Sequence, residues 1–270
     1  MIPVIFKDKD LQKEFDEQGY VKVSLLDCND IDTLTRMFYQ FHSNIQANSF
    51  GASSFIQNKS EKIIIRDTLF PIFSPYFEKL FINYSYFGSS YLYKTKGKDS
   101  QLAPHQDWSI VDEKKFVAIN IWTPLIDTNE NNGTLYVLPK SQSQKHFTLR
   151  APTIPFNFQN KIDKVIKNSI ATNAKAGEAV ILNQSLIHFS SPNLIDEVRI
   201  AITSGIKSKG APMLFHYKNG SKDIERYIMP EDFLLDFDDF ANDIYKRPEK
   251  GKFDSIVKKT SIWDKLLNNS

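Results

Sequence analysis

The feature that most constrains the fold is a long stretch of short apolar runs, which extends from residue 84 to residue 207. The runs are rich in β-branched and aromatic residues, and turn signals such as Lys96-Gly97, Asn132-Gly133 and Gly177-Glu178 separate them. They cover residues 84–94, 116–124, 134–138, 179–182, 186–189 and 198–207. Many short strands at this spacing are typical of a β-sandwich or barrel. We therefore expect a mainly β protein of the jelly-roll kind.

Helices are expected on both sides of this β-rich stretch. Asp8 and Gly19 are suited to begin and end a first helix, and residues 27–45 carry apolar side chains at helical spacing. Pro71 and Pro75 favour a helix that begins near Ser74. The remaining expected elements are a strand over residues 20–26, a loop over 46–62 that is either mobile and next to a site or a plain surface loop, a strand over 212–218 and a helix over 230–245. With no repeat or linker, residues 1–270 are expected to form one domain, with the jelly roll over about 84–218 and helical flanks.

Composition excludes several classes of protein. The 270 residues are 41% hydrophobic without a long apolar run, which argues against a membrane span. A formal net charge of +2 gives no field strong enough to suggest nucleic acid as a partner. Cys28 is the single cysteine, so an intramolecular disulfide and Cys-rich metal modules are excluded. We predict a cytoplasmic monomer or homodimer that acts on a small molecule.

Two histidines and one aspartate suggest a metal site. His105 and Asp107 are separated by one residue, so in an extended segment both side chains project to one face and can chelate one ion. His188 follows much later, in a strand-like run after a turn, and distant strands become neighbours in a jelly roll. Two imidazoles and one carboxylate make the facial triad of non-haem Fe(II) oxygenases, which leaves metal positions open for other ligands.

Arg199 strengthens the case for a site because it lies on the apolar run 198–207. Its flanking residues would bury the base of the side chain, and a buried guanidinium needs an anionic partner. A bound 2-oxo diacid would supply a carboxylate for it. The alternative is a structural ion pair with Asp112, Asp196 or Glu197.

The other histidines have simpler interpretations. His42 lies beside Phe41 on an expected helix, and a structural role is more probable for it than a role in a site. His146 and His216 are also predicted to be structural. Trp108 follows Asp107 directly, and substrate contact and packing are about equally plausible for it.

Several ordered motifs together resemble a known family. They are Pro104-His105-Gln106-Asp107-Trp108, Ile119-Asn-Ile-Trp-Thr-Pro-Leu-Ile-Asp127, Asn132-Gly-Thr-Leu-Tyr-Val-Leu-Pro-Lys-Ser141, and His188-x-Ser190 with Arg199. The sequence resembles the phytanoyl-CoA dioxygenase family of Fe(II)- and 2-oxoglutarate-dependent oxygenases over residues 84–207, and more weakly over its N-terminal part. The resemblance implies a double-stranded β-helix, the cupin-like form of the jelly roll.

The resemblance also implies roles for particular residues. His105, Asp107 and His188 are implied as the iron ligands, while Arg199 and Ser190 are implied to bind the far carboxylate of 2-oxoglutarate. Trp122 is implied to lie near the cosubstrate, or else to fill the barrel. Tyr93 or Lys94 is implied to contact the metal-proximal end of the cosubstrate, and Trp108 is implied to line the substrate pocket.

The sequence departs from the family pattern in one loop and keeps it at one decisive position. The family loop Pro-Gly-Ser-His reads Pro139-Lys140-Ser141-Gln142 here, so its histidine is lost, which concerns substrate contacts more than iron. Asp107 is intact, whereas related halogenases replace this carboxylate with a small residue. Halogenation is therefore disfavoured.

The function that follows from the resemblance is hydroxylation of an unactivated C–H bond in a small metabolite, with Fe(II), 2-oxoglutarate and O2 as cofactor and cosubstrates. The substrate class remains open among amino acids, lipid-like molecules and natural-product intermediates, and the same triad also supports desaturation, epoxidation or ring formation. The alternatives are a cupin-like metal-dependent isomerase, a non-catalytic metabolite sensor and a scaffold with an inert triad.

Overall fold

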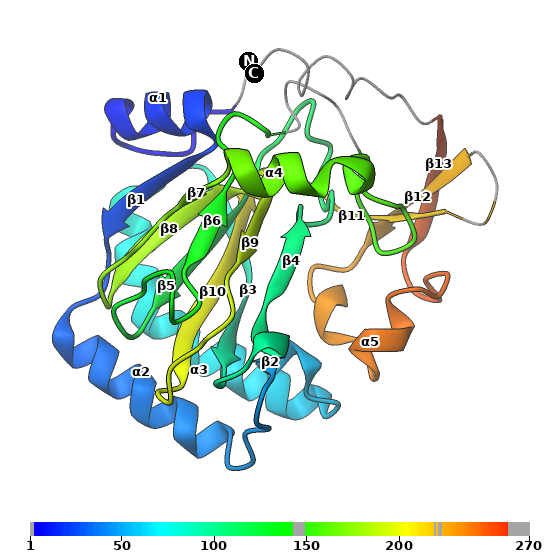
Figure 1. Ribbon diagram of the computed structural model, residues 1–270. Coiled ribbons are helices and arrows are strands. Elements are labelled where there is room, and N and C mark those ends of the chain that lie inside the picture. The colour runs from blue at the N-terminus through cyan, green and yellow to red at the C-terminus, as the bar shows by residue number, and fades with distance from the viewer. Residues whose placement is uncertain (1–2, 143–148, 219, 221–222, 259–270) are drawn as a thin grey trace.

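The computed structural model describes residues 3–142, 149–218, 220 and 223–258. Two antiparallel sheets face each other and form the jelly roll, as Figure 1 shows. The larger sheet contains, in order, β1 (Tyr20–Ser24), β8 (Glu178–Asn183), β5 (Ala118–Pro124), β10 (Arg199–Ser208), β3 (Tyr84–Lys94) and β2 (Phe50–Ala52). The smaller sheet contains β4 (Leu102–His105), β9 (His188–Ser190), β6 (Leu135–Val137) and β7 (Ile170–Ala171). The predicted jelly roll with flanking helices is confirmed.

Three further strands form a separate sheet at the C-terminal side, on the right of Figure 1. It contains β11 (Met213–Tyr217), β12 (Asp223–Met229) and β13 (Lys252–Lys258), of which only the first was expected. The helices are α1 (Lys9–Gln18), α2 (Cys28–Phe41), α3 (Lys59–Leu80), α4 (Ile162–Asn168) and α5 (Phe240–Asp243), with short 3-10 turns η1 (Ser53–Phe55), η2 (Lys98–Ser100), η4 (Gln159–Lys161) and η5 (Phe233–Leu235). Within the described residues, no helix is both long enough and apolar enough to span a bilayer.

The first helix begins and ends where the sequence predicts, whereas the second begins there but ends at Phe41 and not at Ile45. The carboxylate of Asp8 accepts hydrogen bonds from the backbone N–H groups of Asp10 and Leu11, and Gly19 ends α1 with φ +86°. Asp27 caps α2 in the same way, through the N–H of Asp30.

The third helix is longer than the sequence predicts. The expected loop over 46–62 is wrong in its middle, which β2 and η1 occupy, and at its C-terminal end, where α3 begins at Lys59. The helix also continues through Pro71 and Pro75. Proline removes a backbone N–H donor and therefore destabilises a helix interior. Here four apolar side chains at intervals of one turn are buried, and their packing outweighs the cost of the two prolines. The four side chains are Ile65, Leu69, Phe73 and Phe77.

The predicted helix over 230–245 is also wrong, since the segment contains only η5 and α5. Its aromatic side chains still pack in one cluster, because Phe237 contacts both Phe233 and Phe240. The Phe233 ring lies 6.1 Å from Phe215, whereas Phe240 stacks on Trp108 at 5.8 Å. Between them, Asp236 forms ion pairs with Lys59 and Lys250. Ring contacts and ion pairs therefore hold this segment without a long helix.

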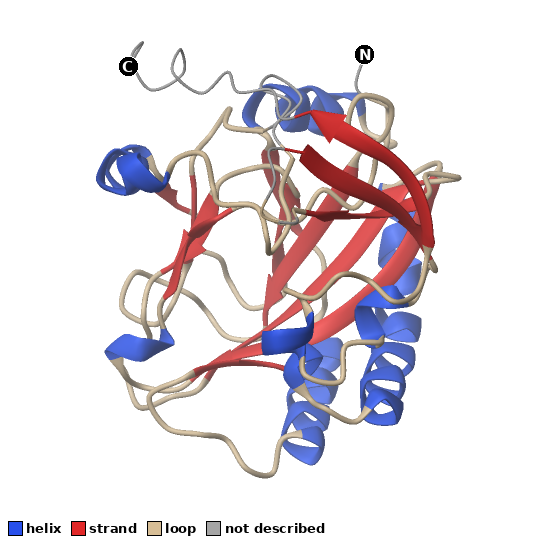
Figure 2. Cartoon of the chain, turned by 90° about the vertical axis from the view of Figure 1, so that its right-hand side faces the viewer, coloured by secondary structure: helices blue, strands red, loops and turns tan. Residues whose placement is uncertain are grey.

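Strand alternation divides the larger sheet into two faces. Tyr91, Ile121 and Ile202 belong to the apolar cluster shared with α1, α2 and α3, and α2 and α3 cover this face in Figure 2. Their sequence neighbours Trp122 and Ala201 belong to a second cluster, which fills the space toward the smaller sheet. Side chains in phase with this second set therefore point into the jelly roll.

Candidate active site

The metal triad predicted from the sequence is assembled at the edge of the smaller sheet. Strands β4 and β9 pair so that His105 lies opposite His188, and Asp107 follows β4 directly. One ligand atom from each of the three residues lies within 4.8 Å of the others. His188 Nε2 is 3.9 Å from Asp107 Oδ1, and the two imidazole centroids are 4.2 Å apart. The three side chains converge on one point, as metal ligands must.

Both imidazoles are held in the tautomer that suits a metal. His105 Nδ1 donates to the carbonyl of Ala103 at 2.8 Å, and His188 Nδ1 donates to the carbonyl of Leu186 at 2.9 Å. Each Nε2 therefore keeps its lone pair, since the proton is on the other nitrogen. Burial, followed by the nearby His188, lowers the pKa of His105 to about 4, so this ring is neutral at physiological pH. Neutral imidazole is the form that binds a metal.

The third ligand is oriented by residues that the sequence analysis missed. Asn120 Nδ2 donates to Asp107 Oδ2 at 3.1 Å, and Thr203 in turn donates to the Asn120 side-chain oxygen. Asn120 lies on β5 and Thr203 on β10, which are paired strands. Such partners fix the direction of a ligating carboxylate. The available signal was the polar residue in Ile119-Asn-Ile-Trp, in phase with the inward-facing Trp122.

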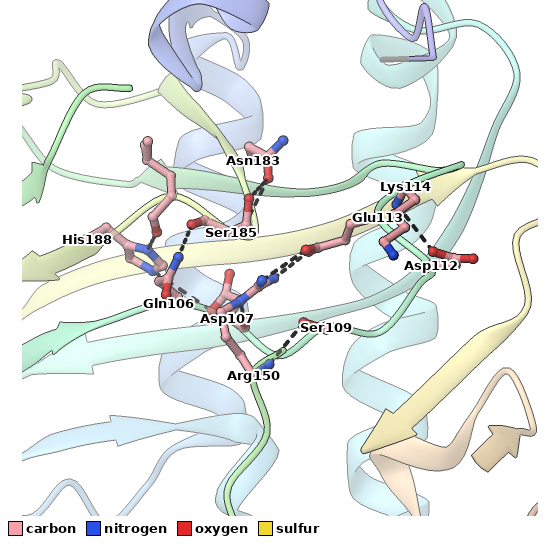
Figure 3. Close-up of polar contacts among 11 residues, drawn as sticks. Gln106, Asp107, Ser109, Asp112, Glu113, Lys114, Arg150, Asn183, Ser185 and His188 are labelled. Atoms are coloured by element: carbon pink, nitrogen blue, oxygen red, sulfur yellow. Dashed lines mark hydrogen bonds and ion pairs between the residues drawn. The ribbon is translucent and has the colours of Figure 1, made fainter. Parts of the chain in front are cut away.

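Two further contacts anchor the backbone around the triad, as Figure 3 shows. Gln106 Nε2 donates to the carbonyl of Ser185, on the turn that leads to His188. Arg150 Nε donates to the carbonyl of Asp107 at 2.7 Å, while its guanidinium forms an ion pair with Glu113. The triad turn is therefore fixed from both sides. No sequence pattern links Arg150 to this turn, so we could not have predicted the contact.

Arg199 lies at the polar end of the same cavity without an anion. It is 1% exposed, its Nε has no hydrogen-bond partner, and its Nη1 makes a single long contact of 3.5 Å with the carbonyl of Leu92. Among the described residues, no carboxylate lies within 4.0 Å of its guanidinium, which excludes the three ion pairs considered above. Burial lowers the pKa of Arg199 to about 9, and the group remains charged at neutral pH.

A second basic group lies beside this guanidinium. Lys94 is opposite Arg199 in the β3–β10 register and is fully buried. Its ammonium donates to the carbonyls of Ser191 at 2.7 Å and Ser190 at 3.3 Å. Burial and the charge of Arg199 lower the pKa of Lys94 to about 6. Neither basic group has a carboxylate partner within 4.0 Å among the described residues, and of the two only Arg199 lines the cavity. Gly133 packs against both, since a Cβ there would lie 2.7 Å from Lys94 Cδ and 3.4 Å from Arg199 Nε.

The other predicted cosubstrate residues separate into two groups. Trp122 and Ser190 line the cavity, and Trp122 places its ring 5.8 Å from the guanidinium carbon of Arg199. Tyr93 does not line it. Its ring contacts Phe38 and His42 on the face covered by helices, since it has the opposite strand phase to Lys94. We therefore drop Tyr93 as a cosubstrate residue. Lys94 lies beside Arg199, not at the metal-proximal end where it was expected.

The cavity has a volume of about 390 Å³ and continues from the triad to an apolar end. Trp108 lines it, as expected, and stacks almost parallel to Phe240 with an interplanar angle of 8°. Two polar residues that the sequence analysis did not single out also line it. Gln184 has a buried Oε1 without a partner, and Lys62 of α3 is 3% exposed.

The remaining histidines lie away from the triad. His42 ends α2 and stacks on Phe38 at 4.6 Å, and burial lowers its pKa. His216 is buried on β11, where burial lowers its pKa to about 4. His146 lies outside the described residues. The structural interpretation of His42 and His216 agrees with these positions.

Sequence comparison connects this site to known proteins. The sequence model of the phytanoyl-CoA dioxygenase (PhyH) family matches residues 15–201. A phytanoyl-CoA dioxygenase from Arabidopsis thaliana is 29% identical over 116 residues, or 42% of this chain and 41% of that protein. Phytanoyl-CoA dioxygenase 1 from Oryza sativa subsp. japonica is 25% identical over 127 residues, or 43% of this chain and 42% of that protein. The matched region thus spans less than half of either relative.

Solved structures share the fold at lower identity. The 2-oxoglutarate-dependent carbocyclase SnoK from nogalamycin biosynthesis has a TM-score of 0.56 at 16% identity, over 76% of this chain and 86% of that chain. The epimerase SnoN, in complex with Fe3+, alpha ketoglutarate and nogalamycin RO, has a TM-score of 0.54 at 16% identity over 94% of both chains. HygX from Streptomyces hygroscopicus, with nickel and 2-oxoglutarate bound, has a TM-score of 0.55 at 12% identity, over 75% of this chain and 87% of that chain. Because the family model covers well over half of the sequence, the chain belongs to the phytanoyl-CoA dioxygenase family.

Proposed function

We propose that the protein is a non-haem Fe(II)- and 2-oxoglutarate-dependent dioxygenase that hydroxylates an unactivated C–H bond of a small molecule. The observation that carries this proposal is the guanidinium of Arg199, which is buried without an anion in the cavity that also holds His105, Asp107 and His188. A triad alone would suit many metal proteins. A triad together with a buried guanidinium that has no carboxylate partner among the described residues favours a cosubstrate that carries two acidic groups.

The residues present fit both groups. His105, Asp107 and His188 would hold the iron, with Asn120 fixing the carboxylate ligand. Arg199 would pair with the far carboxylate of 2-oxoglutarate. Ser190 lines the cavity with it, and Lys94 donates to the Ser190 carbonyl without lining the cavity itself. When bound, iron and 2-oxoglutarate supply the oxidising chemistry, in which O2, the cosubstrate and substrate–H give substrate–OH, succinate and CO2.

The chain itself positions the reactants and excludes water. Apolar side chains, including Phe87, Trp108 and Leu182, line the cavity around the triad. An apolar lining excludes water and so protects a reactive oxidant from solvent. The residues C-terminal to β12 also contribute to this wall, which supports the proposal that residues 1–270 act as one domain with the helical flanks included.

The test is an anaerobic titration with Fe(II) and 2-oxoglutarate, followed by exposure to O2. We expect a visible metal-to-ligand charge-transfer band and then equimolar formation of succinate, and Arg199→Ala should weaken the band. A folded, iron-loaded wild-type protein without the band would contradict the proposal. That result would favour the metal-dependent isomerase or the metabolite sensor, neither of which needs 2-oxoglutarate.

Hydroxylation needs its own measurement because a carbocyclase and an epimerase share this fold. For a substrate that the enzyme converts, turnover under 18O2 should give a product that contains one additional oxygen atom, and mass spectrometry should show that this atom is 18O. A product of unchanged composition, or one that has lost two hydrogens, would exclude hydroxylation while leaving the oxygenase class intact.

A further inference from the structure

The apolar end of the cavity contains one buried cation with an incomplete set of partners. Lys62 donates a single hydrogen bond, to the carbonyl of Phe237, and no carboxylate of the described residues lies within 4.0 Å of its ammonium. An ammonium has three N–H donors. Lys59, one turn earlier on α3, is different: it is partly exposed and forms ion pairs with Asp236 and Asp232.

The position of Lys62 explains why this difference matters. A buried cation without an anionic partner is costly, and such groups mark binding sites. Burial lowers the pKa of Lys62, while Asp238 and Asp243 at longer range act against this shift. The side chain of Lys62 lines the cavity from α3, whereas the guanidinium of Arg199 lines it from β10. It is therefore a separate positive group, on a different wall.

Two facing glycines, which have no side chains, form the floor of the apolar end. Gly88 lies on β3 opposite Gly205 on β10, and a Cβ added at Gly88 would meet nothing within 4 Å. At Gly205 the space is taken by the Phe87 ring, which would lie 2.1 Å from an added Cβ. The cavity is thus open above Gly88, and the side chains around it are mainly apolar, including Phe55, Leu234 and Phe240.

We propose, on the basis of the oxygenase function above, that the substrate is a small, mainly apolar molecule with one anionic group. The anion binds Lys62, and the apolar body lies over Gly88. A carboxylate or a similar oxyanion supplies the acceptors that the two remaining N–H groups lack. A neutral, fully apolar substrate would leave this ammonium buried without a counter-ion.

The experiment compares acids with their amides in the protein saturated with Fe(II) and 2-oxoglutarate without O2. The probes are 3-phenylpropanoate, decanoate and the two corresponding amides, titrated by calorimetry. We expect each acid to bind about 10-fold more tightly than its amide, because a charge-assisted hydrogen bond is about twice as strong as a neutral one. Lys62→Met should remove this preference. The matched Lys79→Met variant, at an exposed position of the same helix, should keep it.

A second variant tests the floor. Gly88→Leu fills open space without a strained backbone, so it should fold and still give the charge-transfer band, but it should weaken acids and amides alike by about 10-fold or more. Arg199→Met should lose the band and keep the acid preference.

The outcomes separate this inference from the oxygenase function. Equal affinity for acid and amide, binding by neither, or a preference that survives Lys62→Met would overturn the inference while the band remains. Absence of the band in the wild type, with an acid preference lost in Lys62→Met, would overturn the oxygenase function and leave the anion site at Lys62.

Discussion

The two ends of the cavity are built in different ways. At the polar end, paired strands of the two sheets present the triad, Lys94 and Arg199, and all of these lie within the region matched by the family model. At the apolar end, the wall comes from η1, α3 and residues 234–240, the last of which lie beyond that region. Ion pairs and ring contacts, rather than strand pairing, hold this second wall. We infer that the reaction is determined by the sheets and the choice of substrate by the covering segments.

The largest expected effect is at the polar end. Arg199→Met should lower the affinity for 2-oxoglutarate by about 100-fold or more, because it removes the charged guanidinium that can donate two hydrogen bonds to one carboxylate. It should also stabilise the ligand-free protein by about 1 kcal/mol or more, because a buried cation without a partner is replaced by an apolar side chain of similar length. Titration and scanning calorimetry measure the two quantities.

The control for this variant is Arg36→Met, which changes an exposed arginine on α2. It should alter neither quantity. A less stable Arg199→Met protein that still binds 2-oxoglutarate would show that Arg199 is a structural residue.

An intermediate effect is expected at the apolar end. Phe240→Ala removes the ring that stacks on Trp108, so 3-phenylpropanoate should bind about 10-fold more weakly, with the loss of about 1–2 kcal/mol of apolar contact. The affinity for 2-oxoglutarate, followed by the charge-transfer band, should remain within about two-fold of the wild type. Phe253→Ala, at an exposed position on β13, is the control. If both affinities fall, the two ends are not independent.

The smallest effect concerns the protonation of Lys94. With a pKa of about 6, this amine is mostly neutral at pH 7.5 in the ligand-free protein, and a bound dianion should raise its pKa. Binding of 2-oxoglutarate should therefore take up as much as about one proton and tighten as pH falls from 8 to 6. Titrations in phosphate and Tris buffers, whose ionisation enthalpies differ, measure this uptake.

The same pKa shift predicts a change in stability with pH. Between about pH 6 and pH 10 the unfolded chain holds the Lys94 proton and the folded chain does not, so the contribution of Lys94 to the free energy of unfolding rises with pH. Lys94→Met should abolish both the proton uptake and this slope. Uptake that persists in Lys94→Met would assign the proton to another group.

Local sequence patterns predicted the strands and the triad well because both depend on short-range features. The alternation of side chains places His105 and Asp107 on one face, and the β-branched runs coincide with β3, β5 and β10. The choice between Tyr93 and Lys94 required the phase of β3 relative to β10, which pairing alone reveals.

The failures come from long-range contacts. The length of α3 depends on packing of Phe73 and Phe77 that outweighs its two prolines, and the broken path of residues 230–245 depends on partners such as Lys59. Lys62 lies among several charged residues near the start of α3, yet the fold buries it. None of these partners is near in sequence.

The register of β3 has a consequence for where a substrate is oxidised. Lys94 marks the cosubstrate end of this strand and Gly88 the floor of the opposite end, with an unbroken ladder to β10 between them. At about 3.3 Å per residue, the strand from Lys94 to Gly88 spans about 20 Å, and strand pairing keeps this distance fixed. A ligand that is anchored at one end of this distance presents one particular carbon to the oxidant. The position of oxidation therefore follows from the length of the ligand and not from recognition of the carbon itself.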